Sequence, residues 1–278
     1  MNQIRIDDVW PLSPLQEGLL FHAGYDERTR DIYVGQNVLE LAEPLDSAVL
    51  RASWQAVLDR HASLRASFRQ PAGAPRPVQV VATGVTLPWQ EHDLSDLPAG
   101  EVDDEVRRLT EKELQKGFDL SVPPLLRLLL LKLPGGAYRL VVTMHHIVMD
   151  GWSQPILFDE VADVYAAGGD PAGLPPVPPY RDYLAWLARQ DQEAARAAWR
   201  DALAGLGEPT LVRPGASALP VPPGHVTRRL DRAATDRLRE AARARGLTVN
   251  TVVQGAWGLL LGRLTGRDDV VFGATVAG

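Results

Sequence analysis

The stretch LLRLLLLKLPGGAYRLVVTMHHIVMDGWS, residues 125–153, determines most of what the sequence predicts about the fold. Two apolar runs, Leu125–Leu133 and Ala137–His146, flank a Pro-Gly-Gly sequence that favours a tight chain reversal. Each run is far shorter than the roughly 20 apolar residues that a membrane helix needs. We therefore predict a β-hairpin whose two strands are buried and central in a sheet.

The second of these strands ends in two adjacent histidines. Side chains alternate along a strand, so His146 shares a face with Leu140, Val142 and Met144, whereas His145 points to the opposite face. One imidazole can reach a cleft at the strand end, and the other is expected to be packed and hydrogen-bonded. Alternation does not decide which histidine has which role, but it argues against a metal site that uses both.

The loop after the strand supplies further polar chemistry. An imidazole accepts protons near neutral pH, because its ordinary pKa is about 6.5. Asp150 is placed to orient an imidazole or to pair with an arginine that holds the loop, and Gly151 permits a turn or a close approach to substrate. A buried histidine followed by a tight turn is the alternative. The full pattern HHxxxDG favours function, since we expect it by chance about once in a thousand chains of this length.

Composition narrows the possible functions. The 278 residues carry a formal charge of −6, which provides no basic surface for nucleic acid or an anionic membrane. The chain has no cysteine, so any thiol chemistry must arrive on a substrate. The opening MNQIRIDDVW contains two acids and no long apolar run, so we expect a cytoplasmic protein. GxSxG, Walker and dinucleotide-binding glycine motifs do not occur in the sequence.

Helical and strand patterns are mixed on both sides of the hairpin. Ser13, Pro14 and Gln16 predict a helix start, with the serine as N-cap and the glutamine completing a capping box. Periodicity predicts further helices from a cap at Asp46 to residues 60–62, over 100–116, 156–167, 233–245 and 249–264, and one long helix over about 183–203. It predicts strands over 32–41, 64–68, 78–81, 85–89, 227–230 and 270–276.

A proline- and glycine-rich segment, GGDPAGLPPVPP at residues 168–179, predicts a boundary between two lobes. We place the lobes at residues 1–175 and 176–278. Trp186 and Trp199 are expected in the core because they belong to an apolar stripe at helical spacing. Arg60 and Arg65 either hold the histidine loop, stabilise packing or are solvated ends of a helix. His22, His61, His92 and His225 have no evident constellation and are expected to be structural or exposed.

Four motifs, in order, resemble those of the condensation domain of nonribosomal peptide synthetases, a relative of chloramphenicol acetyltransferase. They are PLSPLQEGLLFH (11–22), RHASLRASF (60–68), MHHIVMDGWS (144–153) and YRDYLAW (180–186). With VVFGATVAG at residues 270–278, the resemblance covers the whole chain. It implies an α/β fold of two chloramphenicol-acetyltransferase-like sandwiches with a tunnel between them. Because domains of that family are longer, we expect a complete first lobe, a truncated second lobe and little or no activity of this chain alone.

The resemblance also implies an activity and its partners. An acceptor aminoacyl thioester attacks a donor peptidyl or aminoacyl thioester, both held on phosphopantetheine arms of carrier proteins, and the domain itself binds no cofactor. By position, His146 is the active histidine and His145 its structural partner, while Asp150 anchors the loop through an arginine. Gly151 keeps the tunnel open, and Trp152 and Ser153 are candidates to line it.

Finer features of the motifs resemble one subtype. Gln16-Glu17-Gly18 with Phe21-His22, and Val148-Met149 before Asp150, are similar to domains that follow an epimerisation domain and accept a D-configured donor. An adenylation domain is expected downstream. Two alternatives share the fold: an epimerisation domain, and a non-catalytic module that docks or recruits carriers. Trp152 before Ser153 argues against the former, and intact His146 and Gly151 against the latter.

Overall fold

The computed structural model describes residues 5–25, 32–41, 44–213 and 226–274. The chain forms two compact units, Met1–Gln190 and Asp191–Gly278, and each is described by itself. Within the described ranges, no helix combines the length and apolar character needed to cross a membrane.

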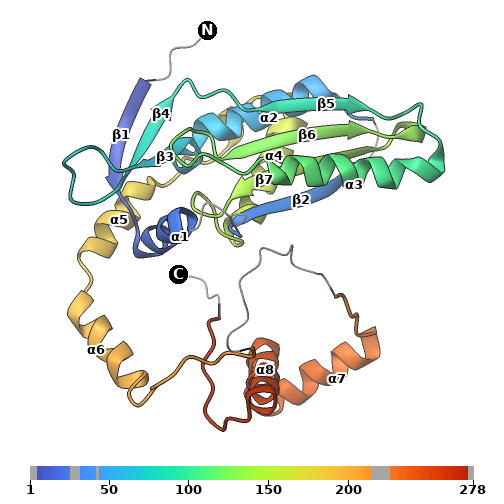
Figure 1. Cartoon of the computed structure of the whole chain (residues 1–278). Helices are drawn as coiled ribbons and strands as arrows, with labels where there is room; N and C mark the ends of the chain where they lie inside the picture. The colour runs from blue at the N-terminus through green and yellow to red at the C-terminus, as the bar shows by residue number, and fades with distance from the viewer. Residues whose placement is uncertain (1–4, 26–31, 42–43, 214–225, 275–278) are drawn as a thin grey trace. The chain divides into compact units, whose positions relative to one another are not determined.

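The first unit contains most of the regular structure (Figure 1). Its elements in chain order are β1 (Arg5–Pro11), α1 (Pro14–Tyr25), β2 (Val34–Leu41), α2 (Ser47–Arg60), η1 (Ala62–Arg65), β3 (Ala66–Arg69), β4 (Val78–Thr83), β5 (Trp89–Asp93), α3 (Ala99–Gln115), β6 (Leu126–Lys132), η2 (Pro134–Gly136), β7 (Tyr138–His145), α4 (Ser153–Ala166), η3 (Pro171–Gly173) and α5 (Tyr180–Ala188).

These strands form two sheets. A three-stranded antiparallel sheet has the order β1-β4-β3, and a four-stranded sheet has the order β2-β7-β6-β5. In the second sheet β5 runs parallel to β6, and the other neighbours are antiparallel. The predicted hairpin is confirmed as β6 and β7, joined by the short helix η2. It supplies the two central strands of the larger sheet.

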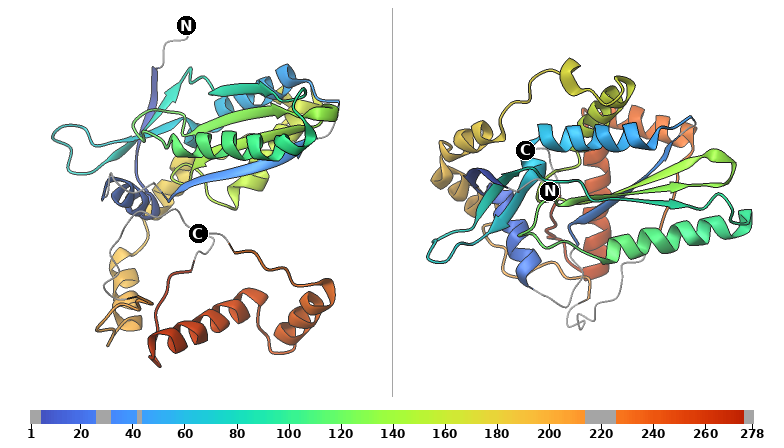
Figure 2. Two further views of the ribbon diagram at one scale, coloured as in Figure 1. Left: turned by 45° about the vertical axis from the view of Figure 1, so that its right-hand side comes forward. Right: turned by 90° about the horizontal axis from the view of Figure 1, so that it is seen from above.

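Both faces of the hairpin are buried, which explains why its sequence is apolar without alternation. Leu128, Leu130 and Val142 pack with apolar residues of α2 and α4 in one core. Leu129, Leu131 and Val141 point the other way and pack with residues of α3 in a second core. The view from above in Figure 2 shows α2 and α3 on opposite sides of this sheet.

Helix boundaries in the first unit largely follow their sequence signals. Ser13 and Gln16 form the predicted capping box: the Ser13 hydroxyl accepts from the Gln16 N–H at 3.2 Å, and Gln16 Oε1 accepts from the Ser13 N–H at 2.9 Å. Asp46 caps α2 by accepting from the N–H groups of Ala48 and Val49, both at 3.0 Å. Both caps confirm the sequence prediction.

Three predicted boundaries in this unit need correction. The strand predicted at 64–68 is split, since residues 62–65 form the turn η1 and only β3 is extended. The strand predicted at 85–89 begins at Trp89 instead, because β5 pairs with β6 only from there on, directly after Pro88. Helix α4 begins at Ser153, three residues before the predicted start, since Asp150 accepts hydrogen bonds from Ser153 there.

The second unit contains α6 (Gln192–Ala202), α7 (Arg232–Arg243) and α8 (Val249–Thr265). The single long helix predicted over 183–203 is wrong: α5 ends at Ala188, and Asp191 starts α6 by accepting from the Ala194 N–H at 2.9 Å. The strands predicted at 227–230 and, as far as it is described, at 270–276 are not formed. The described part of this unit contains no strand, so residues 227–230 and 270–274 have no neighbouring strand there with which to pair.

The predicted burial of two tryptophans differs from the structure. Trp186 and Trp199 are 49% and 68% exposed rather than core residues, because α5 buries only Leu184 and α6 buries no side chain. The first compact unit extends to Gln190, because α5 packs on it through Leu184 and through a ring contact of Tyr180 with Trp10.

Candidate active site

The first histidine of the motif, His145, is fully buried. His145 ends β7 with none of its surface exposed, and its ring contacts those of Tyr33 and Phe118. Its Nδ1 accepts a hydrogen bond from the Ile147 N–H at 3.0 Å. The imidazole thus fixes the first residues of the loop that follows the strand.

The second histidine is placed differently. His146 follows β7 directly, and its backbone N–H donates to the Tyr33 carbonyl at 2.9 Å. Its ring is only partly buried. The other members of its face, Leu140, Val142 and Met144, lie in the core, so the face becomes accessible only at its last residue.

The contacts of His146 select a proton arrangement on its ring. Nδ1 lies 3.3 Å from the Met149 carbonyl oxygen, which can only accept a hydrogen bond. Nδ1 is therefore the protonated nitrogen of the neutral imidazole, and Nε2 keeps a lone pair. This arrangement makes Nε2 the atom that can take a proton from a substrate.

The loop from Ile147 to Trp152 is held from a distant part of the sequence. The buried amide of Gln16 donates through Nε2 to the Ile147 carbonyl at 3.0 Å. Its Oε1 also accepts from Gln79 Nε2 at 3.0 Å, and Gln79 in turn donates to the Pro11 carbonyl at 2.7 Å. The capping residue of α1 thus also positions the backbone directly after His146. This contact of Gln16 could not be predicted from its helix-capping pattern, because nothing local signals a partner 131 residues away.

Asp150 and Gly151 occupy the outer part of this loop. The Asp150 carboxylate accepts from the backbone N–H and the hydroxyl of Ser153, at 2.8 and 2.6 Å, and so starts α4. Of the arginines in the described ranges, none forms an ion pair with Asp150. A Cβ added to Gly151 meets no atom within 4 Å. Trp152 is 71% exposed.

The two arginines of the second motif lie in packing positions and not at the histidine loop. Arg60 contacts Glu160 of α4, Nε to Oε2 at 3.1 Å, and donates to the Pro175 carbonyl. Arg65 is buried, donates to the Ala82 carbonyl and lies 3.5 Å from Asp7. Both therefore join elements of the first unit.

His61 belongs to a cluster that sequence analysis missed. Its Nε2 lies 2.6 Å from Glu160 Oε2, the same oxygen that Arg60 contacts. Glu160 lies 99 residues away in the sequence, so no local signal announces the pair. The cluster ties the end of α2 to the middle of α4.

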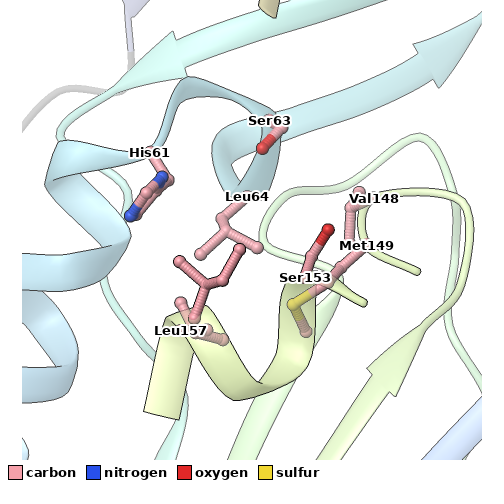
Figure 3. A pocket seen from close by; sticks show the side chains of 8 residues that line it. His61, Ser63, Leu64, Val148, Met149, Ser153 and Leu157 are labelled. Atoms are coloured by element: carbon pink, nitrogen blue, oxygen red, sulfur yellow. The ribbon is translucent and has the colours of Figure 1, made fainter. Parts of the chain in front are cut away.

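A cavity of about 210 Å³ lies between this cluster and the histidine loop. Figure 3 shows Leu64 facing Leu157 across it, with His61 on one side and Ser153 on the other. Its lining residues come from the end of α2, the turn η1, the loop and α4: His61, Ser63, Leu64, Val148, Met149, Ser153, Ile156 and Leu157. His146 is not among them, so the cavity adjoins the loop without containing the accessible imidazole.

No metal site accompanies these groups in the described part of the chain, where no three histidine, aspartate or glutamate side chains gather suitably for an ion. The candidate site therefore consists of one accessible imidazole, a buried second imidazole, and a loop held by Gln16 and Asp150.

Comparison with known proteins places this chain in a family. A family model described as the condensation domain matches residues 6–278. The chain belongs to the condensation-domain family. A linear gramicidin synthase of Brevibacillus parabrevis is 41% identical over 279 residues, which cover 98% of this chain and 5% of that protein. Bacitracin synthase 3 of Bacillus licheniformis is 37% identical, with coverage of 98% and 4%. The chain thus spans about one twentieth of the length of these relatives.

Solved structures agree with this assignment. The first condensation domain of the calcium-dependent antibiotic synthetase, in complex with a substrate analogue, is 26% identical with a TM-score of 0.76. The match covers 95% of this chain and 63% of that one. The resemblance drawn from the four motifs, and with it the α/β fold class, is confirmed. The chain is a condensation-domain sequence of the nonribosomal peptide synthetase type.

Proposed function

We propose that this condensation domain joins an acceptor aminoacyl group to a donor aminoacyl or peptidyl group, both carried as thioesters on phosphopantetheine arms of carrier proteins. The observation that carries the proposal is the partly exposed His146 ring, whose Nδ1 faces the Met149 carbonyl and whose Nε2 keeps its lone pair. The absence of cysteine fits this chemistry, because the reacting thioesters belong to the carriers.

The proposed reaction uses the lone pair on Nε2 of this imidazole. The acceptor amine attacks the donor carbonyl carbon, and a C–N bond forms as Nε2 of His146 takes a proton from the amine. The tetrahedral intermediate then collapses, the C–S bond breaks, and the donor thiolate leaves. The imidazolium returns its proton to that thiolate, so His146 ends neutral. Alignment of two tethered reactants supplies a further part of the rate.

The other motif residues support this imidazole. His145 accepts a hydrogen bond from the Ile147 N–H and Gln16 donates one to the Ile147 carbonyl, so both backbone groups of Ile147 are held in the loop that supplies the Met149 carbonyl. Asp150 shapes the start of α4, and Gly151 leaves open space beside the loop. Trp152, the last residue of that loop, and Ser153, the first residue of α4, are the candidates to contact a substrate arm.

The partners of the domain follow from the same proposal. A donor carrier and an acceptor carrier deliver the two thioesters, and an adenylation domain downstream loads the acceptor. The motif details Gln16-Glu17-Gly18 and Val148-Met149 support a donor of D configuration, delivered after an upstream epimerisation domain.

Replacing His146 by alanine tests the role of the base. In the intact condensation domain with both carriers loaded, we expect dipeptide formation to fall about 100-fold or more, the usual contribution of a general base. Product is measured by mass spectrometry of the acceptor carrier. His92→Ala is the matched control, because His92 is exposed on β5 and lies outside the loop, so its turnover should equal that of wild type.

The same assay separates the alternatives. Unchanged turnover of His146→Ala would remove the imidazole from the mechanism. Exchange of the donor α-proton with deuterated water, without dipeptide, would indicate an epimerisation domain. Carrier binding without either reaction would indicate a docking module. Matched D and L donor thioesters decide the subtype, and preferential or equal use of the L donor would contradict a D-donor domain.

A further inference from the structure

Gly35 of β2 lies directly against the accessible imidazole. It pairs with Met144 in the β2–β7 ladder, and since opposite residues of an antiparallel pair share a face, it lies on the face of His146. A Cβ placed on Gly35 would lie 3.0 Å from His146 Nε2 and 3.6 Å from each flanking carbon, Cδ2 and Cε1. Its nearest neighbour would therefore be the nitrogen that keeps the lone pair.

Backbone conformation does not explain a glycine at this position. Gly35 is absent from the glycines with positive φ, and it sits inside a strand, where glycine weakens the structure. Other residue types adopt this backbone without strain. What the glycine provides here is space on the face where the imidazole lies.

The His146 ring has little freedom to move away from an added methyl group. Its backbone N–H is bonded to the Tyr33 carbonyl at 2.9 Å, and its Nδ1 faces the Met149 carbonyl at 3.3 Å. The longer distances to the two carbons put the added Cβ mainly over the face of the ring, at its Nε2 edge. A side chain there would tilt the ring and loosen its contact with Met149 rather than fill empty space.

We propose that Gly35 is a positioning residue for His146: its bare backbone is the surface on which the imidazole rests, and this holds Nε2 toward the reacting amine. The effect on turnover rests on the proposed function of His146, whereas the seating of the ring does not. A substitution at Gly35 should therefore change the position of the His146 ring even if the domain catalyses a different reaction.

Gly35→Ala and Gly35→Val test the proposal, with Gly100→Ala as the matched control. Gly100 is an exposed glycine of α3 whose added Cβ meets no atom within 4 Å. We expect Gly35→Ala to lower kcat about tenfold with KM unchanged, less than the roughly 100-fold that a 1 Å misplacement costs, and Gly35→Val to lower it further. The melting temperature of Gly35→Ala should change little, because the steric cost at the His146 ring and the smaller conformational freedom of the unfolded chain act in opposite directions.

A second measurement reads the imidazole without turnover. The rate at which diethyl pyrocarbonate modifies His146, followed by peptide mass spectrometry, should fall several-fold in Gly35→Ala and stay at the wild-type value in Gly100→Ala. The ¹⁵N chemical shifts of the His146 ring should move only in the Gly35 variants.

The outcomes decide the two proposals separately. Unchanged modification rate and unchanged ring shifts in a folded Gly35→Ala would overturn the seating of the imidazole. Slower modification together with full turnover of His146→Ala would leave the seating intact and refute the base role. If Gly35→Val does not fold, Gly35→Ala alone decides.

Discussion

Strand β6 and helix α8 are both rich in leucine, but the leucines of β6 are buried in the first unit, whereas most of those of α8 in the second unit are exposed. The leucines of β6 lie between α2 and α4 on one face and α3 on the other, and Leu128 is 2% exposed. In α8, which the structure describes in full, Leu259 is 73% exposed, and Leu261 is the only large apolar side chain that is buried. An apolar run therefore favours burial, but the elements that pack around it determine whether its side chains are buried.

The same substitution in both segments gives the largest expected contrast. Leu128→Ala should lower the free energy of unfolding by about 2–5 kcal/mol, because it removes buried apolar area and leaves a cavity. Leu259→Ala should change it by no more than about 0.5 kcal/mol, as substitutions at exposed positions do. Urea denaturation followed by circular dichroism measures both. An equal cost for the two variants would show that α8 is buried, and would remove the contrast.

A second contrast compares ion pairs. Glu113 of α3 is buried, and it contacts Arg127, Nε to Oε1 at 2.6 Å, as well as Lys116. In the second unit, Asp236 pairs with Arg239 at 3.6 Å on an exposed helix. Glu113→Gln should destabilise by about 2–3 kcal/mol at pH 7, somewhat below the cost of breaking a fully buried pair. Asp236→Asn should cost about 0.5 kcal/mol or less.

The pH dependence sharpens this second contrast. Burial by itself raises the pKa of the Glu113 carboxyl, but hydrogen bonds from Lys116 and Arg127 and their charges outweigh it, so the pKa lies below its ordinary value of 4.5. A pKa lowered by folding adds stability above about pH 4.5, and that stability is lost as the pH falls through the folded value. The difference between wild type and Glu113→Gln should therefore shrink below pH 4.5. A constant difference from pH 7 to pH 3 would contradict this assignment.

The smallest contrast concerns helix caps. Gln16→Leu should lower the free energy of unfolding by about 1–3 kcal/mol, since it leaves buried polar groups of Ser13, Gln79 and Ile147 without their partner. Thr248→Ala removes the exposed cap of α8, whose hydroxyl accepts from the Thr251 N–H at 3.1 Å, and should cost about 0.5–1 kcal/mol.

Turnover adds a second measurement to this contrast, because Gln16 also holds the backbone after His146. Gln16→Leu should reduce dipeptide formation more than its loss of stability explains at a temperature where the variant is fully folded. Gln79→Leu, which disturbs the same amide pair without touching Ile147, is the control. Equal turnover of these two variants would show that the Ile147 contact has no catalytic effect.

Much of the first unit could be predicted because its signals are local. The Ser13–Gln16 capping box, the Asp46 cap and the apolar hairpin each encode their structure within a few residues. The failures come where structure depends on distant partners. Strand β5 starts at Trp89 because its pairing with β6 starts there. Residues 227–230 form no strand, because the described part of the second unit contains no strand with which they could pair. The long helix predicted over 183–203 failed for another reason, because apolar periodicity was followed across the local cap at Asp191.

The site divides in the same way. The sequence by itself determined that two adjacent histidines on a strand face opposite directions, since this follows from the pleat of any strand. Only the tertiary structure decided that His145 is enclosed by Tyr33 and Phe118, while His146 emerges beside Gly35 with its Nδ1 turned to Met149. Exposure is a property of the elements that surround a side chain. Here those elements come from parts of the chain up to 131 residues apart, where no periodicity in the sequence can report them.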